Sequence, residues 1–219
     1  MNKSKRLPSG LYGVTPDWDD PLRLEQAVAA AIAGGMTALQ LRHKTASPEL
    51  RTRLAKRVQP ICREHHVPLI INDDWQLALD VGADGVHLGK DDEDPATVRD
   101  ELGADMLLGV SCYSDLDRAR RMLALGVDYV AFGAMFASGT KPHAPGASLD
   151  IIKQARALTQ SMAPNTAVVA IGGITVDNAP SVLAAGADSL AVVGGLFMTP
   201  DIETTARSFQ ALMSSSAAK

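Results

Sequence analysis

Two apolar segments of the sequence stop abruptly in acidic side chains. "LIINDD" (69–74) ends in Asp73 and Asp74, and "GVHL" (85–88) is followed at once by "GKDDED". If both segments are neighbouring strands of a parallel sheet, their acidic ends share one edge of that sheet. A pair of carboxylates in oxygen-rich surroundings suits a hard cation such as Mg²⁺, which takes further ligands from water and from a phosphorylated substrate.

Cationic side chains follow other apolar segments, where they would meet the same acids. Arg42 and Lys44 lie in "QLRHK" (40–44), and Lys141 ends "ASGTK" (137–141). Such charges bind polyanionic oxygens, and an arginine holds them with two hydrogen bonds at once. Taken singly, each of these residues is equally well explained as a solvated loop residue. Together, at the carboxyl ends of parallel strands, they indicate a diphosphate site with an implied Mg²⁺.

Two glycine pairs follow the last two apolar segments, in "IGGI" (171–174) and "VVGG" (192–195). Glycine lets backbone N–H groups approach a phosphate closely, and the first turn of a following helix adds its dipole. One pair alone would indicate no more than a tight turn. Two pairs, after the seventh and eighth segments, favour a monophosphate site.

Other polar residues are weaker candidates. His87 lies inside an apolar segment without a visible nucleophile, so a buried histidine with satisfied hydrogen bonds is favoured over a catalyst. Ser111 lacks the G-x-S-x-G setting of a hydrolase nucleophile and is predicted to be a hydrogen-bond donor. Cys112 should point away into the packing, because alternate strand residues face opposite sides. His65 and His66 end a predicted helix and should be exposed.

The elements that must position these residues alternate along the chain. We predict strands near residues 11–15, 37–41, 68–72, 84–88, 107–111, 128–132, 167–171 and 189–193. Their nearly continuous apolar character is typical of strands buried on both faces of a parallel sheet. Between them apolar residues recur at helical spacing, as at Leu24, Val28 and Ile32. Ser114 with Asp117 resembles a capping box that opens a helix.

A weak internal repeat supports the same architecture. "GADGVHL", "GVDYVAF" and "GADSLAV" each place Gly-x-Asp after a helix and before a strand, where glycine takes the left-handed conformation at low cost. Eight β/α units without a domain break predict an α/β protein with a single (β/α)8 TIM barrel of parallel strands. An open doubly wound sheet is the alternative, although no G-x-G-x-x-G follows the first strand. We predict an N-terminal extension at 1–10, the barrel catalytic domain at 11–213 and a flexible tail at 214–219.

Composition limits the classes of partner. The chain has 219 residues, of which 46% are apolar but only 4% aromatic, so little aromatic surface is left for stacking bases. The net charge of −4 and the lack of a long basic run disfavour a nucleic-acid partner. No apolar stretch approaches the roughly 20 residues that cross a bilayer. The first residues also lack the apolar core of a signal peptide, so we expect a cytoplasmic protein that acts on small molecules.

The segments "LQLRHK", "IINDD", "GADGVHLG", "GVS", "TKP" and "VAIGGI", in this order, resemble the thiamine phosphate synthase (thiamine-phosphate pyrophosphorylase) family. The resemblance extends from "GLYGVT" to "VVGG". It implies a (β/α)8-barrel transferase of thiamine biosynthesis, with Mg²⁺ as its metal. Such an enzyme joins a hydroxymethylpyrimidine diphosphate to a thiazole phosphate, plain or carboxylated, and forms thiamine monophosphate and pyrophosphate. The implied route is dissociative: a pyrimidinylmethyl cation forms, and the thiazole nitrogen captures it.

The resemblance also assigns residues to roles. The pyrimidine diphosphate would be bound by Gln40, Arg42, Lys44, Asn72, Ser111 and Lys141. The residues expected to act in catalysis are Arg42, Lys44, Ser111 and Lys141. The Mg²⁺ ligands would be Asp73 and Asp92, with Asp74 and Asp91 beside them. The thiazole phosphate would be bound by Ser138, Thr140, Gly173, Val193 and Gly194.

Three segments depart from the family pattern. Lys90 and Asp91 stand where the family has Gln-Glu, which adds a cation near the metal. Residues 138–141 read Ser-Gly-Thr-Lys in place of Thr-x-Thr-Lys, which keeps a hydroxyl in a looser loop. Gly194 and Gly195 replace Ser-Ala after the last strand. If the missing hydroxyl matters, binding of the thiazole phosphate weakens.

Two other functions are compatible with such a barrel. A thiazole tautomerase-like enzyme would transfer a proton, and it would need neither the diphosphate cations nor the paired acids. A non-catalytic barrel would bind thiamine precursors without converting them. Release of pyrophosphate from the two substrates separates these three functions. A homo-oligomer is compatible with the sequence.

Overall fold

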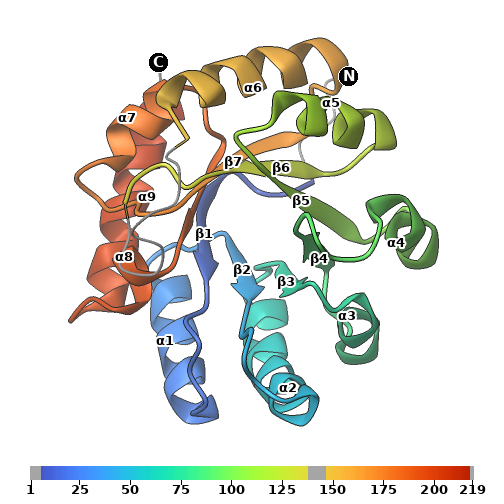
Figure 1. Ribbon diagram of the computed structural model, residues 1–219. Helices are drawn as coiled ribbons and strands as arrows, with labels where there is room; N and C mark the ends of the chain where they lie inside the picture. The colour runs from blue at the N-terminus through green and yellow to red at the C-terminus, as the bar shows by residue number, and fades with distance from the viewer. Residues whose placement is uncertain (1–5, 138–146, 218–219) are drawn as a thin grey trace.

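A computed structural model describes residues 6–137 and 147–217 (Figure 1). The strands in these two ranges are β1 (Gly10–Val14), β2 (Ala38–Leu41), β3 (Leu69–Asn72), β4 (Gly85–Leu88), β5 (Leu107–Tyr113), β6 (Tyr129–Phe132), β7 (Ala167–Ile171) and β8 (Ser189–Val192). The helices are α1 (Pro21–Ala33), α2 (Pro48–Glu64), α3 (Trp75–Val81), α4 (Pro95–Leu102), α5 (Leu116–Leu125), α6 (Leu149–Met162), α7 (Ala179–Ala184), α8 (Gly194–Phe197) and α9 (Ile202–Ala217).

The strands form one closed parallel barrel in the order β1-β2-β3-β4-β5-β6-β7-β8. Pairing of β1 with β8, with Tyr12 opposite Ala191, closes the sheet. The helices lie around the outside of the barrel (Figure 1). The predicted (β/α)8 TIM barrel is therefore confirmed, and the open doubly wound sheet is excluded.

The start of α5 differs from the prediction. Strand β5 continues past Ser111 to Tyr113 through an irregularity in its pairing with β6. The helix then begins at Leu116 with Asp115 as its N-cap, and the Asp115 carboxylate accepts a hydrogen bond of 2.8 Å from the N–H of Arg118. The predicted capping box at Ser114 is wrong, because the longer strand moves the turn along the chain. An ionised carboxylate is also a strong acceptor at the positive end of a helix.

Short polar residues set the other helix boundaries near the candidate site. Ser47 caps α2 by accepting from the N–H of Leu50, and Asp74 caps α3 by accepting from Leu77. Side-chain caps of this kind satisfy N–H groups that the first helical turn leaves unpaired. At the other end of α3, Gly82 takes the left-handed conformation that the Gly-x-Asp repeat predicted.

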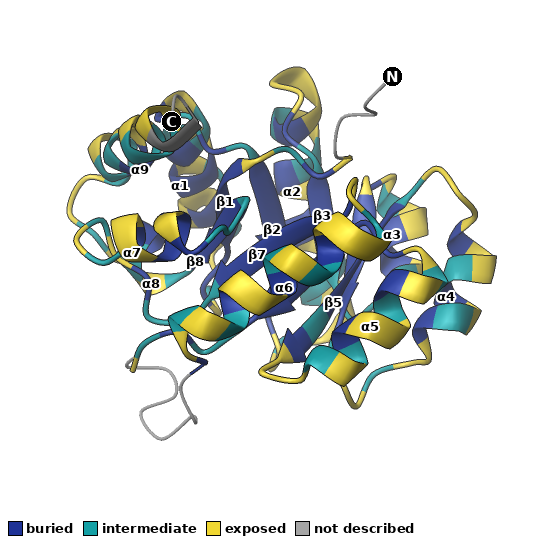
Figure 2. Ribbon diagram, turned by 90° about the horizontal axis from the view of Figure 1, so that it is seen from above, coloured by how far each residue is buried: buried dark blue, intermediate teal, exposed yellow. Residues whose placement is uncertain are grey.

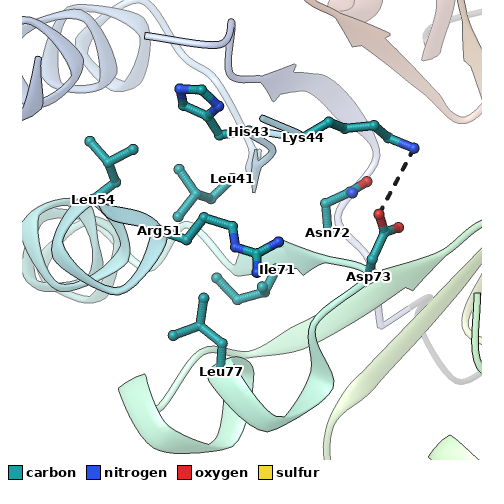
Figure 3. A pocket seen from close by; sticks show the side chains of 9 residues that line it. All are labelled: Leu41, His43, Lys44, Arg51, Leu54, Ile71, Asn72, Asp73 and Leu77. Carbon is teal, nitrogen blue, oxygen red and sulfur yellow. Dashed lines mark ion pairs between the residues drawn. The ribbon is translucent and has the colours of Figure 1, made fainter. Parts of the chain in front are cut away.

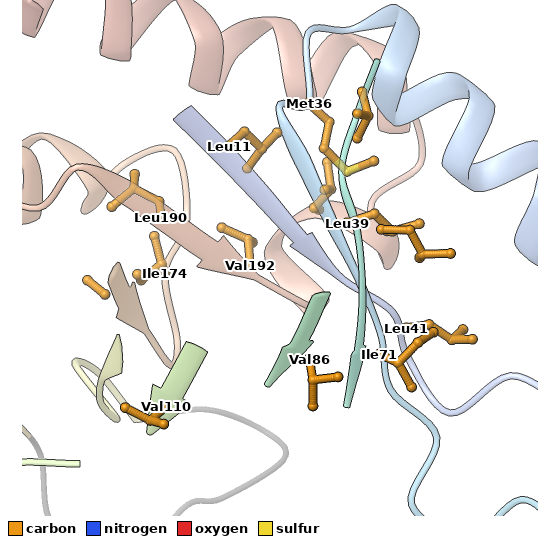
Figure 4. Close-up of a cluster of buried hydrophobic side chains, with 14 of the residues drawn as sticks. Leu11, Met36, Leu39, Leu41, Ile71, Val86, Val110, Ile174, Leu190 and Val192 are labelled. Carbon is orange, nitrogen blue, oxygen red and sulfur yellow. The ribbon is translucent and has the colours of Figure 1, made fainter. Parts of the chain in front are cut away.

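Apolar side chains fill two layers. The larger lies between the strands and the helices, and it contains Leu11 and Leu39 of the barrel together with Leu24 and Val28 of α1. Figure 4 shows part of this cluster, with Leu11 and Leu39 labelled. The buried strands and the exposed outer faces of the helices are separated clearly in Figure 2. Burial of this apolar surface is the main stabilising contribution to the fold.

The inside of the barrel holds a second cluster, and it is partly polar. Tyr12 and Tyr129 are fully buried there beside aliphatic side chains. The side chains of Gln40 and His87 are also buried. Because a buried polar group is costly without a hydrogen bond, these four residues need partners inside the barrel.

The Gly-x-Asp repeat links strands at the amino end of the barrel. Each of Asp84, Asp128 and Asp188 accepts a 2.8 Å hydrogen bond from a backbone N–H of the strand that precedes its own, namely β3, β5 and β7. Asp128 also pairs with Arg99, and Asp188 with Arg156. These acids therefore have a structural role, at the end of the barrel opposite the predicted site.

Both ends of the described chain pack onto the barrel. Leu7 is buried in the inner cluster, and Arg6 donates a 2.9 Å hydrogen bond to Asp128. Helix α9 packs against α1 and runs on to Ala217, through positions predicted to form a tail. The division of the chain at residues 10 and 213 stays a prediction. No helix within the described ranges has the length and apolar character needed to span a membrane.

Candidate active site at the carboxyl ends of the strands

Side chains from several strand ends meet at one end of the barrel. Asn72 ends β3, and Asp73 follows it directly. Asp92 lies in the loop after β4, and Ser111 lies in the last part of β5. Lys44 lies in the loop after β2. The structure therefore brings together acids, a cation and hydrogen-bonding groups that the sequence places up to 67 positions apart.

Two of the predicted site acids lie side by side. The pKa of Asp73 is raised from 3.8 to about 6, chiefly by burial and then by a hydrogen bond with Asp92 and the negative charge of Asp92. Lys44 and Arg42 act in the opposite direction. Two adjacent carboxylates resist simultaneous ionisation unless positive charge is supplied. Their oxygens fit the ligand preference of a divalent hard cation such as Mg²⁺.

Backbone contacts hold both acids in place. The N–H of Asp73 donates a 2.9 Å hydrogen bond to the carbonyl of His87 on β4, and Asp73 itself has a φ of 65°. A non-glycine residue rarely adopts this left-handed conformation, which is concentrated at functional sites. Asp92 Oδ2 accepts a 2.6 Å hydrogen bond from the N–H of Gly89. The two carboxylates are thus positioned by the ends of adjacent strands.

The described residues offer two carboxylates, and no larger ligand set, for a metal. Within residues 6–137 and 147–217 no group of three or more His, Cys, Asp or Glu side chains is arranged to bind one ion. Of the two flanking acids, Asp74 caps α3 and pairs with Arg51, and Asp91 is exposed. One or two carboxylates with water and substrate phosphates are the usual environment of Mg²⁺. The donor set therefore fits this ion in the presence of a phosphorylated substrate.

The cations after β2 lie on the same side of the site. Lys44 Nζ is 3.9 Å from Asp73 Oδ2, and Figure 3 shows the two side chains facing each other. Arg42 lies 3.4 Å from Asp17 Oδ1. Thr15 holds this loop, because its hydroxyl donates to the carbonyl of Arg42 and accepts from the N–H of the same residue, both at 2.9 Å. The loop thus presents two positive charges from a fixed backbone.

A cavity of about 90 Å³ lies beside the acids, between the ends of β2 and β3 and helices α2 and α3. Its wall contains two residues that the sequence did not indicate, His43 and Arg51 (Figure 3). His43 is buried and makes a 2.7 Å contact with Asp19 Oδ1, and Arg51 is 3.6 Å from Asp74 Oδ2. Arg51 belongs to an amphipathic helix whose other charged side chains face solvent. Its residue type and spacing therefore do not distinguish it from those exposed residues in the sequence.

A chain of buried hydrogen bonds crosses the inside of the barrel. Gln40 Nε2 donates to the Tyr12 hydroxyl at 2.9 Å, and that hydroxyl is 2.8 Å from the hydroxyl of Tyr129. His87 Nδ1 is 3.0 Å from the Tyr129 hydroxyl, and His87 Nε2 is 2.8 Å from Ser111 Oγ. The prediction of a buried, hydrogen-bonded histidine is confirmed. The two tyrosines were missed, because a tyrosine in an apolar strand reads as core.

Other sequence expectations hold. Cys112 is buried in the layer between strands and helices, as the alternation along β5 requires. His65 and His66 are exposed at the end of α2. Burial raises the pKa of the Cys112 thiol to about 12, so this cysteine stays protonated and is an inert packing residue.

Backbone atoms around Gly173, after β7, leave no space for a side chain. Gly173 has a φ of 63°, and a Cβ there would lie 2.7 Å from the carbonyl oxygens of Phe136 and Ala137. The backbone therefore requires glycine at this position whether or not a phosphate binds. Gly194 differs, because a Cβ there would meet only Met198 Sδ, at 3.8 Å.

The turn after β8 leads directly into α8. Val193 is the N-cap of this short helix, and its carbonyl accepts from the N–H groups of Leu196 and Phe197. The assignment of Gly173, Val193 and Gly194 to the thiazole phosphate stays a prediction. The predicted site residues Ser138, Thr140 and Lys141 lie outside the described residues.

Comparison with known proteins gives a consistent result. A model of the thiamine monophosphate synthase family matches residues 11–196. The chain is 59% identical over 213 residues to the thiamine-phosphate synthase of Bordetella bronchiseptica, covering 97% of this chain and 98% of that protein. Identity to the thiamine-phosphate synthase of Methylobacillus flagellatus is 49%, with 93% and 94% covered. The solved structure of thiamine phosphate pyrophosphorylase from Pyrococcus furiosus is similar with a TM-score of 0.82 and 29% identity, covering 97% and 98%.

Proposed function

Because the chain belongs to the thiamine monophosphate synthase family, we propose that it joins a hydroxymethylpyrimidine diphosphate to a thiazole phosphate. The products are thiamine monophosphate and pyrophosphate. The observation that carries this proposal is the adjacent pair Asp73 and Asp92, with Lys44 at 3.9 Å from Asp73. Acids that attract a divalent cation, next to a cation that attracts phosphate, suit a leaving diphosphate.

Bond changes in the reaction define what the chain has to supply. The bond between the methylene carbon and the diphosphate oxygen breaks, and pyrophosphate leaves with the electron pair. The thiazole nitrogen then forms the new carbon–nitrogen bond with its own lone pair. No side chain has to act as nucleophile or base, so the work of the site is to orient the two substrates and to stabilise the developing negative charge.

The residues of the site divide this work. Mg²⁺, held by Asp73 and Asp92, would supply positive charge to the diphosphate. Arg42 and Lys44 add charge from the loop after β2, where Thr15 fixes the backbone. Ser111 offers a hydroxyl to the same substrate. Preorganised charges of this kind stabilise a transition state without reorganisation during the reaction.

The remaining assignments complete the proposal. Asn72 and Lys141 would join the diphosphate-binding residues, and Gln40 would contact the pyrimidine ring. Ser138, Thr140, Gly173, Val193 and Gly194 would bind the thiazole phosphate. A cytoplasmic location belongs to the same proposal, because charged phosphate esters do not diffuse through a lipid bilayer.

A direct test is the release of pyrophosphate when both substrates and Mg²⁺ are supplied. We expect Asp73→Ala and Asp92→Ala each to lose most of this activity and to stay folded, because neither change opens a core cavity. Asp91→Ala is the matched control, since Asp91 is exposed and lies next to Asp92. Full activity of either site variant at limiting Mg²⁺ would refute the metal assignment. Wild-type protein that isomerises the thiazole without releasing pyrophosphate would instead favour a tautomerase.

A further inference from the structure

The buried chain of hydrogen bonds joins two residues assigned to the same substrate. It begins at Gln40 and ends at Ser111, with Tyr12, Tyr129 and His87 between them. The two tyrosine rings meet edge to face at 86°, with centroids 5.8 Å apart. The His87 and Tyr129 rings stack at 19° and 5.5 Å. These ring contacts and the burial of all three rings restrict the rotation of Tyr12, Tyr129 and His87.

The direction of the hydrogen bonds follows from the number of protons each group carries. An amide nitrogen only donates, so Tyr12 accepts from Gln40. The proton of Tyr12 then goes to Tyr129, and the proton of Tyr129 goes to His87 Nδ1. The His87 ring is buried, and both of its nitrogens contact hydroxyl groups, so the ring is taken as neutral with one proton. That proton is on Nε2 and is donated to Ser111 Oγ.

The opposite direction leaves a proton unused. If His87 Nδ1 donated to Tyr129, the Tyr129 proton would go to Tyr12, which already accepts from Gln40. Among the hydrogen bonds of the described residues, the Tyr12 proton would then have no acceptor. An unsatisfied buried hydroxyl costs stability, which makes the first direction the favoured one. The whole chain would reverse only if the Gln40 amide turned its oxygen toward Tyr12.

We propose that Tyr12, Tyr129 and His87 are positioning residues that polarise this chain, so that Ser111 acts as a hydrogen-bond donor and Gln40 Oε1 as an acceptor toward the pyrimidine diphosphate. This inference rests on the proposed function and extends it to groups inside the barrel. The polarity matches the chemistry of that substrate. An aminopyrimidine offers an N–H for Gln40 to accept, and a diphosphate oxygen accepts the proton of Ser111.

The first test reads the histidine tautomer directly. In full-length protein labelled with ¹⁵N-histidine, His87 is assigned by its loss in His87→Gln. We expect a protonated Nε2 and a bare Nδ1 in the wild type at neutral pH. A protonated Nδ1 in the wild type would overturn the proposal, and this measurement does not depend on the folding of any variant other than the assignment control.

The second test reverses the direction of the hydrogen bonds by a change at Gln40, the end of the chain of hydrogen bonds away from Ser111. Glu in place of Gln40 offers an acceptor where the wild type has a donor, so the Tyr12 proton would turn toward it. We expect Gln40→Glu to move the His87 proton to Nδ1, although residue 40 does not touch His87. Adding Tyr12→Phe to this variant interrupts the chain and should restore the wild-type tautomer. An unchanged tautomer in folded Gln40→Glu would refute the relay.

Kinetics separate positioning from a purely structural role. Tyr129→Phe removes one hydroxyl, and we expect KM for the pyrimidine diphosphate to rise roughly five- to tenfold while KM for the thiazole phosphate changes less than about twofold. Thr166→Val is the matched control, because it removes a buried hydroxyl that bonds the carbonyl of Val127 at the amino end of the barrel. An equal change in both KM values would contradict the proposal. If the wild type released no pyrophosphate, the proposed function would fall, while the tautomer measurements would still decide the polarity.

Discussion

A Cβ atom on Gly109 of β5 would overlap the phenol ring of Tyr129 on β6. The ring of Tyr129 thus fills the space that any side chain at position 109 would need. Gly109 pairs with Tyr129 in the strand register, and the backbone of Gly109 has no left-handed φ. Steric space, and not backbone freedom, is therefore the reason for glycine at this position.

The first prediction concerns this pair. Gly109→Ala should lower the free energy of unfolding by about 3 kcal/mol, at the upper end of the usual cost of overpacking. Tyr129→Ala vacates the same space, so the double variant should be more stable than the sum of the two single changes allows, by about 2 kcal/mol. Denaturant unfolding of the four proteins measures this coupling. Additive losses would mean that the two residues do not compete for space.

The second prediction concerns the raised pKa of Asp73. A carboxyl whose pKa is raised from 3.8 to about 6 stabilises the fold while it is protonated, and this contribution is lost as the pH rises through 6. Asp73→Asn stays neutral and tolerates a positive φ. With EDTA present, we expect the variant to match the wild type near pH 4 and to be about 1–2 kcal/mol more stable near pH 7.5, below the 3 kcal/mol of a full two-unit shift.

Urea unfolding at the two pH values, with and without Mg²⁺, checks this outcome. Mg²⁺ should stabilise the wild type and leave Asp73→Asn unchanged, because a ligand stabilises the state that binds it. Equal stability of the two proteins at both pH values would show that the pKa of Asp73 is not raised in the folded protein.

The third prediction compares two lysines close to the acids. Lys44 Nζ lies 3.9 Å from Asp73, whereas Lys90 is exposed in the loop after β4. Lys44→Gln should lower kcat/KM for the pyrimidine diphosphate. The loss corresponds to about 2–4 kcal/mol of transition-state stabilisation. Lys90→Gln, which restores the residue common in the family, should change it less than about threefold. Steady-state kinetics decide, and a larger loss at Lys90 would mean that the cations are placed wrongly.

The fourth prediction separates the two glycines after β8. A Cβ on Gly195 would collide with the carbonyl oxygen of Ile174, while a Cβ on Gly194 has room. Gly194→Ser should therefore fold normally and change KM for the thiazole phosphate by no more than roughly threefold, as for one neutral hydrogen bond. Gly195→Ala should shift the turn and lower the thermal unfolding midpoint. A large gain in affinity from Gly194→Ser would show that the natural protein lacks a needed contact.

The tight packing at Gly173 affects the interpretation of activity measurements on variants of this residue. Replacing Gly173 by Val would affect activity even without a phosphate nearby, because the side chain would push against the backbone of Phe136 and Ala137. Loss of activity in that variant is therefore no measure of phosphate binding. The open space at Gly194 makes it the better probe of the thiazole phosphate site.

The sequence by itself determined the barrel and the end of it that carries the acids and cations. Apolar segments and helical spacing are local patterns, and each predicted strand appears in the structure. Once eight parallel strands close, all their carboxyl ends meet at one end, so residues such as Asp73 and Lys44 necessarily gather there. The start of α5 at Leu116 was not predicted, because local periodicity of the sequence does not indicate an irregularity in strand pairing.

Only the tertiary structure decided which side chains touch. Tyr12 and Tyr129 are 117 positions apart, and their hydrogen bond depends on the register of strands across the barrel. The same holds for the raised pKa of Asp73, which results from burial and from the neighbouring Asp92. It also holds for Gly109, where the ring of Tyr129 on β6 leaves no room for a side chain. Spacing along a chain sets which face a residue occupies, but the distance between residues on different strands is set by closure and packing, and those depend on the whole sequence at once.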